Sequence, residues 1–483
     1  MGGSSLKEKT AKGLFWGGMS NGIQQLLGLI FGIFLARLLS PSDYGLVGML
    51  AIFSALADAI PESGLGMALI NKKEIRREDC NAVFWVNMAL AAFCYLLMFF
   101  MAPLIARFFH TPELVLLARC SFLVFLISSA AIVPAALLQK ELRIKERAIS
   151  NIVSMTMSGL VGIWLAYRGF GYWTLVIQSF VYSTLMTVLY WYFSEWRPSF
   201  KVNLQPVKEM YGFAVRILVT NVVDIVNTNF FSVVLGRLYT KNEVGYYNQA
   251  NKWSLMGSSL IRGMVNSVAQ PVLVEVSDSN ERQHRVFRRI VRFTAFVSFP
   301  AMLGLAFIAP ELITITITEK WLPSAEMLQI LCLGSAFIPI SHVFSSLVIS
   351  KGRSSAYMWC KVSLCILLFI SMLLVYPYGI RWMIITYSII NMFWVGVWFL
   401  LVRKDIQYSF MQLAGDLIPF LGITVAIIAG VFFLTRGIEN MYWSMCAKIF
   451  LVAGTYILTM WISGSVTFRD CVQFVLNRFR KNR

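Results

Sequence analysis

The sequence predicts an all-α integral membrane protein with about fourteen transmembrane helices. Of its 483 residues, 58% are hydrophobic and only 14% are charged, which leaves too little polar surface for a soluble domain. Long apolar runs recur along the whole chain. Helices are the default in lipid, because they satisfy every backbone polar group internally.

The expected spans follow one another with short connectors. In order, they cover residues 14–37, 44–66, 81–102, 114–138, 148–167, 170–193, 211–236, 244–268, 288–310, 325–349, 355–376, 380–402, 412–434 and 441–465. An even number of spans places both termini on one side of the membrane. About two thirds of the 42 Lys and Arg residues lie in the termini and in the loops on that side. The positive-inside rule therefore predicts cytoplasmic termini.

The net charge of +18 is concentrated in two basic runs. One run is Arg282, Arg285, Arg288, Arg289 and Arg292, around the start of the span at 288–310, and the other is Arg478, Arg480, Lys481 and Arg483 in the tail. Membrane topology and contact with anionic lipids explain both runs, so we expect no nucleic-acid partner. The eight cysteines form no CxxC pair, which indicates free thiols and no metal site.

Residues 35–45 and 235–245 nearly repeat each other at an offset of 200. Leu35, Arg37, Leu38 and Gly45 recur as Leu235, Arg237, Leu238 and Gly245, while Ser40 corresponds to Thr240 and Asp43 to Glu243. Six spans separate the copies, so the two halves are parallel repeats. A membrane protein made of two like halves usually holds its substrate between them.

This repeat predicts two six-helix lobes followed by two additional helices. We expect an N-lobe at residues 1–196 and a cytoplasmic inter-lobe linker at 197–210. A C-lobe follows at 211–403, and residues 404–483 form the last two spans and a basic cytoplasmic tail.

The stretch from Leu38 to Gly45, with Ser63-Gly64-Leu65-Gly66 at the end of the second span, resembles one known family. It is the Wzx-type polysaccharide-transporter branch of the multidrug/oligosaccharidyl-lipid/polysaccharide (MOP) flippase superfamily. Its members are similar in length, span number and two-lobe layout. The resemblance covers essentially the whole chain and is strongest over residues 10–260.

The resemblance implies a flippase in the bacterial cytoplasmic (inner) membrane and not an enzyme. Such a protein moves undecaprenyl-pyrophosphate-linked oligosaccharide repeat units from the cytoplasmic to the outer leaflet by alternating access, for cell-surface polysaccharide biosynthesis. Membrane lipids are expected partners, and a polysaccharide polymerase and a chain-length regulator are left open as further ones. No cofactor is expected. Coupling to H⁺ or Na⁺ is also left open.

Ionisable and amide side chains at bilayer depth are candidates for the substrate site, because they are unfavourable there without a partner or cavity. In the seventh span, Arg216, Thr220, Asp224 and Asn227 share one helical face beside Asn221. At the 200-residue offset, Ser20, Asn21 and Gln24 of the first span correspond to Thr220, Asn221 and Asp224. Alternatively, these groups form hydrogen bonds between packed helices.

The eighth span adds Asn248, Lys252 and Arg262. Arg262 and Lys252 are the best candidates for binding a pyrophosphate, since Arg grips phosphate oxygens in pairs and Lys acts as a point charge. The alternative is that Lys252 extends toward an interface and that Arg262 marks a cytoplasmic helix end. We therefore assign headgroup binding to Arg216, Lys252, Arg262, Asn21, Gln24, Asn221 and Asn248.

Acidic residues suggest a gate or an ion-coupling site. Asp58 and Glu62 lie in the second span, with Pro61 breaking the helix between them. Glu62 corresponds to Arg262 at the 200-residue offset, so the two form a hypothetical inter-lobe gate pair that charge swapping would test. For H⁺ or Na⁺ coupling, Asp224 is the first candidate and Asp58 the second.

Other ionisable residues within spans are Lys361, Lys448, Asp416 and His342. His342 has the chemistry for a proton relay, although a lone His in a helix is more often structural.

Two further functions compete with the flippase. An ion-coupled exporter of drugs or other small molecules would share the superfamily, but a cationic drug favours an acidic cavity, and the basic candidates slightly outnumber the acidic ones. A membrane-embedded polysaccharide polymerase or glycosyltransferase would need catalytic groups in a sizeable outer loop, and the predicted outer loops are short.

Overall fold

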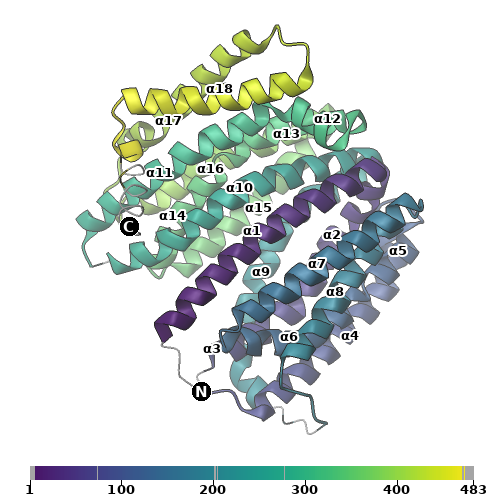
Figure 1. Cartoon of the computed structure of the whole chain (residues 1–483). Coiled ribbons are helices and arrows are strands. Elements are labelled where there is room, and N and C mark those ends of the chain that lie inside the picture. Colours follow the sequence, from purple (N-terminus) through teal and green to yellow (C-terminus); the bar gives the residue numbers. More distant parts are fainter. Residues whose placement is uncertain are drawn as a thin grey trace. The chain divides into compact units, whose positions relative to one another are not determined.

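The computed structural model describes residues 6–72, 74–200, 203, 205–276, 278–469 and 473. Every regular element in these ranges is a helix (Figure 1), which confirms the predicted all-α class. Internal contacts divide the chain into two compact units. Unit 1 ends at Gly245, and unit 2 begins at Tyr246.

Unit 1 contains nine helices, one π-helical turn and the first turn of a tenth helix, within the described residues. They are α1 (Leu6–Leu38), α2 (Pro41–Pro61), the π-helical turn η1 (Glu62–Gly66), α3 (Met67–Asn71), α4 (Arg77–Phe108), α5 (Leu114–Ser121), α6 (Val124–Lys140), α7 (Ile144–Tyr167), α8 (Trp173–Phe193), α9 (Gln205–Leu238) and the first turn of α10 (Lys241–Glu275).

Unit 2 contains the rest of α10 and the helices that follow it. They are α11 (Asn280–Phe307), α12 (Ala309–Ile317), the 3-10 turn η2 (Glu319–Trp321), α13 (Leu322–Ser335), α14 (Ile338–Ser350), α15 (Ser354–Val375), the 3-10 turn η3 (Tyr376–Tyr378), α16 (Ile380–Val402), α17 (Phe410–Thr435) and α18 (Met441–Ile462).

Eleven helical segments in the described part of the chain are long and apolar enough to cross a membrane. The expected count of fourteen is therefore not confirmed. The three expected spans outside this set are those at 44–66, 211–236 and 244–268. In α2 the apolar stretch within the described residues is Pro41–Leu56. Helix α10, of 35 residues, is long enough but too polar. Helix α9 has 34 residues, but the first half of the expected span lies largely outside the described residues, so that span is not tested. These three include most of the predicted site residues.

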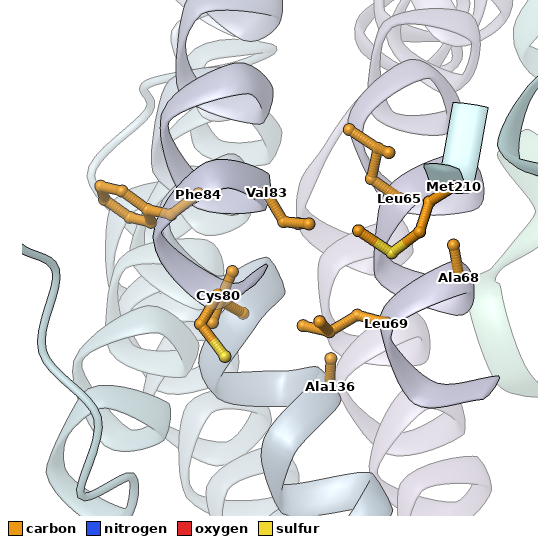
Figure 2. Packing of buried hydrophobic residues seen from close by; sticks show 9 residues of the cluster. Leu65, Ala68, Leu69, Cys80, Val83, Phe84, Ala136 and Met210 are labelled. Carbon is orange, nitrogen blue, oxygen red and sulfur yellow. The ribbon is translucent and has the colours of Figure 1, made fainter. Parts of the chain in front are cut away.

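The second expected span changes geometry at Pro61. Proline has no N–H to donate to the helical ladder, and the regular helix gives way to the π-helical turn Glu62–Gly66. A buried apolar cluster fixes this turn (Figure 2). Leu65 and Leu69 pack there with Val83 of α4 and Met210 of α9.

The segment between α8 and α9 is attached to α4. The Asn81 side-chain amide donates a hydrogen bond to Ser199 Oγ at 2.6 Å, and the Trp85 indole donates to the Ser199 carbonyl at 2.9 Å. The Phe200 and Trp85 rings are 5.3 Å apart. Helix α9 begins at Gln205, inside the range 197–210 expected to be a linker. The lobe boundaries themselves remain a prediction.

The two last long helices belong to unit 2. Helix α17 packs along α11, and α18 contacts α11, α12 and α17. Two of the ionisable residues noted in spans have partners here. Lys448 donates a hydrogen bond to Glu311 Oε1, and Asp416 accepts hydrogen bonds from Arg288. Both residues therefore have structural roles.

Candidate functional site

The two copies of the repeat have the same local structure. Helix α1 ends at Leu38 and α2 begins at Pro41, while α9 ends at Leu238 and α10 begins at Lys241. The offset of 200 residues is thus preserved at each helix boundary.

Each turn ends in a capping box, in which a side chain at the helix start and another three residues later satisfy free backbone amides. The Ser40 amide donates to Asp43 Oδ2 at 2.9 Å, and the Asp43 amide donates back to Ser40 Oγ at 3.3 Å. The Thr240 amide donates to Glu243 Oε2 at 2.9 Å, and the Glu243 amide donates back to Thr240 Oγ1 at 3.4 Å. The Ser/Thr and Asp/Glu matches in the repeat are therefore explained by capping.

Within unit 1 the two turns contact each other through their backbones. A Cβ added at Gly45 would lie 1.9 Å from the Lys241 carbonyl oxygen, and a Cβ added at Gly245 would lie 1.9 Å from the Pro41 carbonyl oxygen. The contact is reciprocal, since each glycine meets the first residue of the other helix. Only glycine fits at these two positions, which accounts for the matching glycines of the repeat.

A layer of buried apolar side chains lies beside the two turns. Phe231 and Leu235 of α9 are 2% and 0% exposed. A Cβ at Gly236 would lie 2.8 Å from both Met49 and Phe109, so α9 packs tightly there. Phe231 shares a helical face with Asp224 and Asn227. The polar face of α9 therefore ends at the buried apolar layer formed around Phe231 and Leu235.

The predicted site residues of unit 1 are only partly described. Asn221, Asp224 and Asn227 are half-buried, and Asp224 and Asn227 have interaction partners. In α1, the Gln24 amide donates to Ser20 Oγ at 2.8 Å within the same helix, and Asn21 is exposed.

The side chains of Arg216, Asp58 and Glu62 lie outside the described residues. Their roles, and the hypothetical pair of Glu62 with Arg262, therefore stay predictions.

In unit 2, helix α10 has a packed face and a polar face. Ser254 and Ser258 are buried, and Ser254 Oγ lies 2.7 Å from Ser335 Oγ of α13. Arg262 follows Ser258 by one turn and lies at the edge of the packed face, whereas Asn248 and Ser259 fall on a different face of the helix. Lys252 shares that face, is exposed, and forms no hydrogen bond or ion pair with the described residues.

Three basic side chains from different helices of unit 2 lie within electrostatic range of one position, that of His342. Arg262 of α10 and Lys361 of α15 both interact electrostatically with His342 of α14, and all three are half-buried. The Arg262 Nε is buried and has no hydrogen-bond acceptor among the described atoms. A buried guanidinium donor without an acceptor is unfavourable, so this position suits an anionic ligand. We call Arg262, His342 and Lys361 the cationic cluster.

The sequence identified Arg262 as a headgroup ligand and counted Lys361 among the basic groups that favour an anionic cargo, but it assigned neither Lys361 nor His342 to the binding site. Both are ionisable groups within spans, yet nothing in the sequence indicates that Arg262 and Lys361 both act electrostatically on His342. Asn248 is half-buried and has interaction partners.

Comparison with known proteins assigns the family. A family model described as "Polysaccharide biosynthesis protein" matches residues 34–326, which is more than half of the chain. The chain belongs to this family of polysaccharide biosynthesis proteins.

Two relatives align with most of this chain. The lipopolysaccharide biosynthesis protein WzxC of Escherichia coli is 25% identical over 72% of the chain and 71% of its own length. The teichuronic acid biosynthesis protein TuaB of Bacillus subtilis is 24% identical over 92% of both. The resemblance to Wzx-type transporters is thus confirmed.

Solved structures share the fold. The lipid II flippase MurJ, in an inward closed conformation, matches 94% of this chain and 99% of its own with a TM-score of 0.77 at 15% identity. An inward-facing multidrug resistance MATE transporter of the MOP superfamily matches 80% of this chain and 94% of its own with a TM-score of 0.65 at 17% identity. The polysaccharide biosynthesis protein is therefore a multi-pass membrane protein with a transporter fold, and it is grouped with transporters and not with enzymes.

Proposed function

We propose that this protein is a flippase for polyprenyl-pyrophosphate-linked oligosaccharide repeat units, moving them from the cytoplasmic to the outer leaflet of the inner membrane. The observation that supports the proposal best is the cationic cluster of unit 2. Moving a pyrophosphate through a bilayer requires its charge to be offset. Arg262 and Lys361 would supply that charge, and the neutral His342 ring could donate one N–H to a phosphate oxygen.

The reciprocal contact at Gly45 and Gly245 supplies the second part of the proposal. With cytoplasmic termini, as the charge distribution predicts, both turns lie at the outer face of the membrane. Their contact would then close the outer side while the substrate enters from the cytoplasm. Separation of the turns would release the headgroup outward, which is the alternating-access scheme.

A small-molecule exporter is the second candidate. A cationic drug would be repelled by Arg262 and Lys361. In the described part of unit 2, no carboxylate forms an ion pair with Arg262. This electrostatic mismatch is our reason for preferring an anionic substrate. If transport is coupled to H⁺ or Na⁺, Asp224 remains the first candidate for the ion site.

The test measures outward exposure of a fluorescent polyprenyl-pyrophosphate-linked oligosaccharide in liposomes containing the purified protein. We expect the wild-type protein to accelerate exposure and Arg262→Gln to slow it by about 10- to 150-fold, since a hydrogen bond to a charged group is worth about 1.5–3 kcal/mol. Arg381→Gln is the matched control, because Arg381 is an exposed residue of α16.

Wild-type rates with Arg262→Gln would remove the cationic cluster from the mechanism. If the wild-type protein fails to accelerate exposure but transports a cationic dye, the exporter becomes the better assignment.

A further inference from the structure

The first turns of α11 form one wall of a basic pocket. The pocket has a volume of about 440 Å³, and His284, Arg285, Arg288, Arg289 and Arg292 line it together with Thr467 from the segment after α18. All of these residues belong to unit 2. The pocket is separate from the cationic cluster, which involves α10, α14 and α15. It therefore needs its own explanation.

A single buried carboxylate orients two of the arginines. Asp416 of α17 is fully buried. It accepts hydrogen bonds from Arg288 Nε and Nη2, both at 2.8 Å, and further ones from Arg292 Nε and from the Tyr408 hydroxyl. Burial and the neighbouring Asp416 keep the pKa of Tyr408 well above its usual range, so its hydroxyl stays a donor.

Asp416 cannot neutralise the pocket. A carboxylate has about four acceptor sites, and these four hydrogen bonds occupy them. Each guanidinium has five N–H donors, and the remaining donors of Arg288 and Arg292 have no acceptor among the described residues. Arg285 has no ion-pair partner there either. The pocket thus holds free donors of Arg288 and Arg292 in fixed positions, the arrangement that binds phosphate oxygens, whereas Arg289 has an interaction partner of its own.

Consecutive residues of the segment after α18 line the basic pocket and a second, mostly apolar cavity. Thr467 lines the basic pocket, and the next two residues, Phe468 and Arg469, line a second cavity of about 620 Å³. Leu458 and Trp461 of α18 form part of its wall. A ligand with a phosphate at one end and a hydrocarbon chain at the other would fill both.

We propose that the basic pocket binds the phosphodiester headgroup of an anionic phospholipid, with one acyl chain of that lipid in the apolar cavity beside α18. Free phosphate shares the headgroup chemistry, but it would leave the apolar cavity unused. The lipid would contact α11, α17 and α18 together and so stabilise their packing. This site is independent of the proposed flippase activity.

The experiment is native mass spectrometry of the full-length protein in detergent, titrated with phosphatidylglycerol or with phosphatidylcholine. We expect saturable binding of phosphatidylglycerol only. Arg285→Gln combined with Arg289→Gln should weaken it roughly thirtyfold, because each basic residue near an anionic lipid contributes about fivefold. The double Lys variant at the same positions should retain most of the affinity. Arg282→Gln is the matched control, since Arg282 is on the same helix but does not line the pocket.

Equal affinity for both lipids, or an unchanged affinity in the double Gln variant, would overturn the proposal. A competition with inorganic phosphate distinguishes a lipid site from a site for free phosphate. We expect millimolar phosphate to leave bound phosphatidylglycerol in place. Full displacement of the lipid by phosphate alone would show an oxyanion site without lipid specificity, which also contradicts the proposal. A double Lys variant as weak as the Gln variant would indicate a structural role for these arginines instead.

Discussion

Substitution of Gly45 by alanine tests the reciprocal contact directly. The added Cβ would lie 1.9 Å from the Lys241 carbonyl oxygen, whereas real Cβ contacts stay above 3.0 Å. The two helix starts must therefore separate by at least about 1 Å. Overpacking of this kind costs about 1–3 kcal/mol. The penalty applies only while the turns touch, so it should shift the equilibrium toward states with separated turns by about 5- to 150-fold.

The assay measures the distance between spin labels at Ser42→Cys and Asn242→Cys, after replacement of the eight native cysteines. We expect Gly45→Ala to populate a longer distance and to slow transport. Gly422→Ala is the control, because a Cβ there meets nothing within 4 Å. Gly245→Ala should act like Gly45→Ala, and the double variant should add little, since one separation relieves both clashes. A distance distribution and transport rate equal to those of the control would refute the reasoning.

Two other substitutions have defined expectations. Asp416→Asn should lower the free energy of unfolding by about 1–3 kcal/mol, which thermal unfolding measures. This is less than the roughly 3–5 kcal/mol lost when a fully buried pair is broken, because the Arg288 and Arg292 side chains are 26% and 40% exposed. Asp405→Asn, which breaks a more exposed pair with Arg353, should change stability by less than about 1 kcal/mol, and an equal loss in both variants would contradict the argument. Ser40→Ala removes a helix cap and should destabilise the start of α2 by about 0.5–2 kcal/mol. Hydrogen exchange would detect this as faster exchange of the Asp43 amide, and an unchanged rate would exclude the capping role.

Much of the fold follows from the sequence, because membrane thickness sets the length of apolar runs. The runs at 325–349 and 380–402 each coincide with helical segments. The internal break of the first of these was not predicted: α13 ends at Ser335 and α14 begins at Ile338. Apolarity alone carries no signal for such a break. The start of α9 at Gln205 was also missed, because its first turns are polar and extend beyond the apolar run.

The candidate site was predictable where the sequence repeats itself. The repeat located both turns, and it singled out Gly45 and Gly245 without indicating that each one packs against the other helix. That contact depends on tertiary structure. The same holds for His342 and Lys361, whose proximity to Arg262 depends on the packing of three helices that are distant in the sequence.

The capping boxes also bear on how readily the two turns come apart. Asp43 and Glu243 satisfy the exposed amides of their own helices, so neither turn depends on the other for its backbone hydrogen bonds. When the two turns separate, they lose van der Waals packing and weak Cα–H···O contacts. A single Cα–H···O contact is worth about 0.5–1 kcal/mol. The amides of Ser40, Asp43, Thr240 and Glu243 therefore keep their hydrogen bonds when the turns separate. Such a contact is suited to being made and broken once in every turnover.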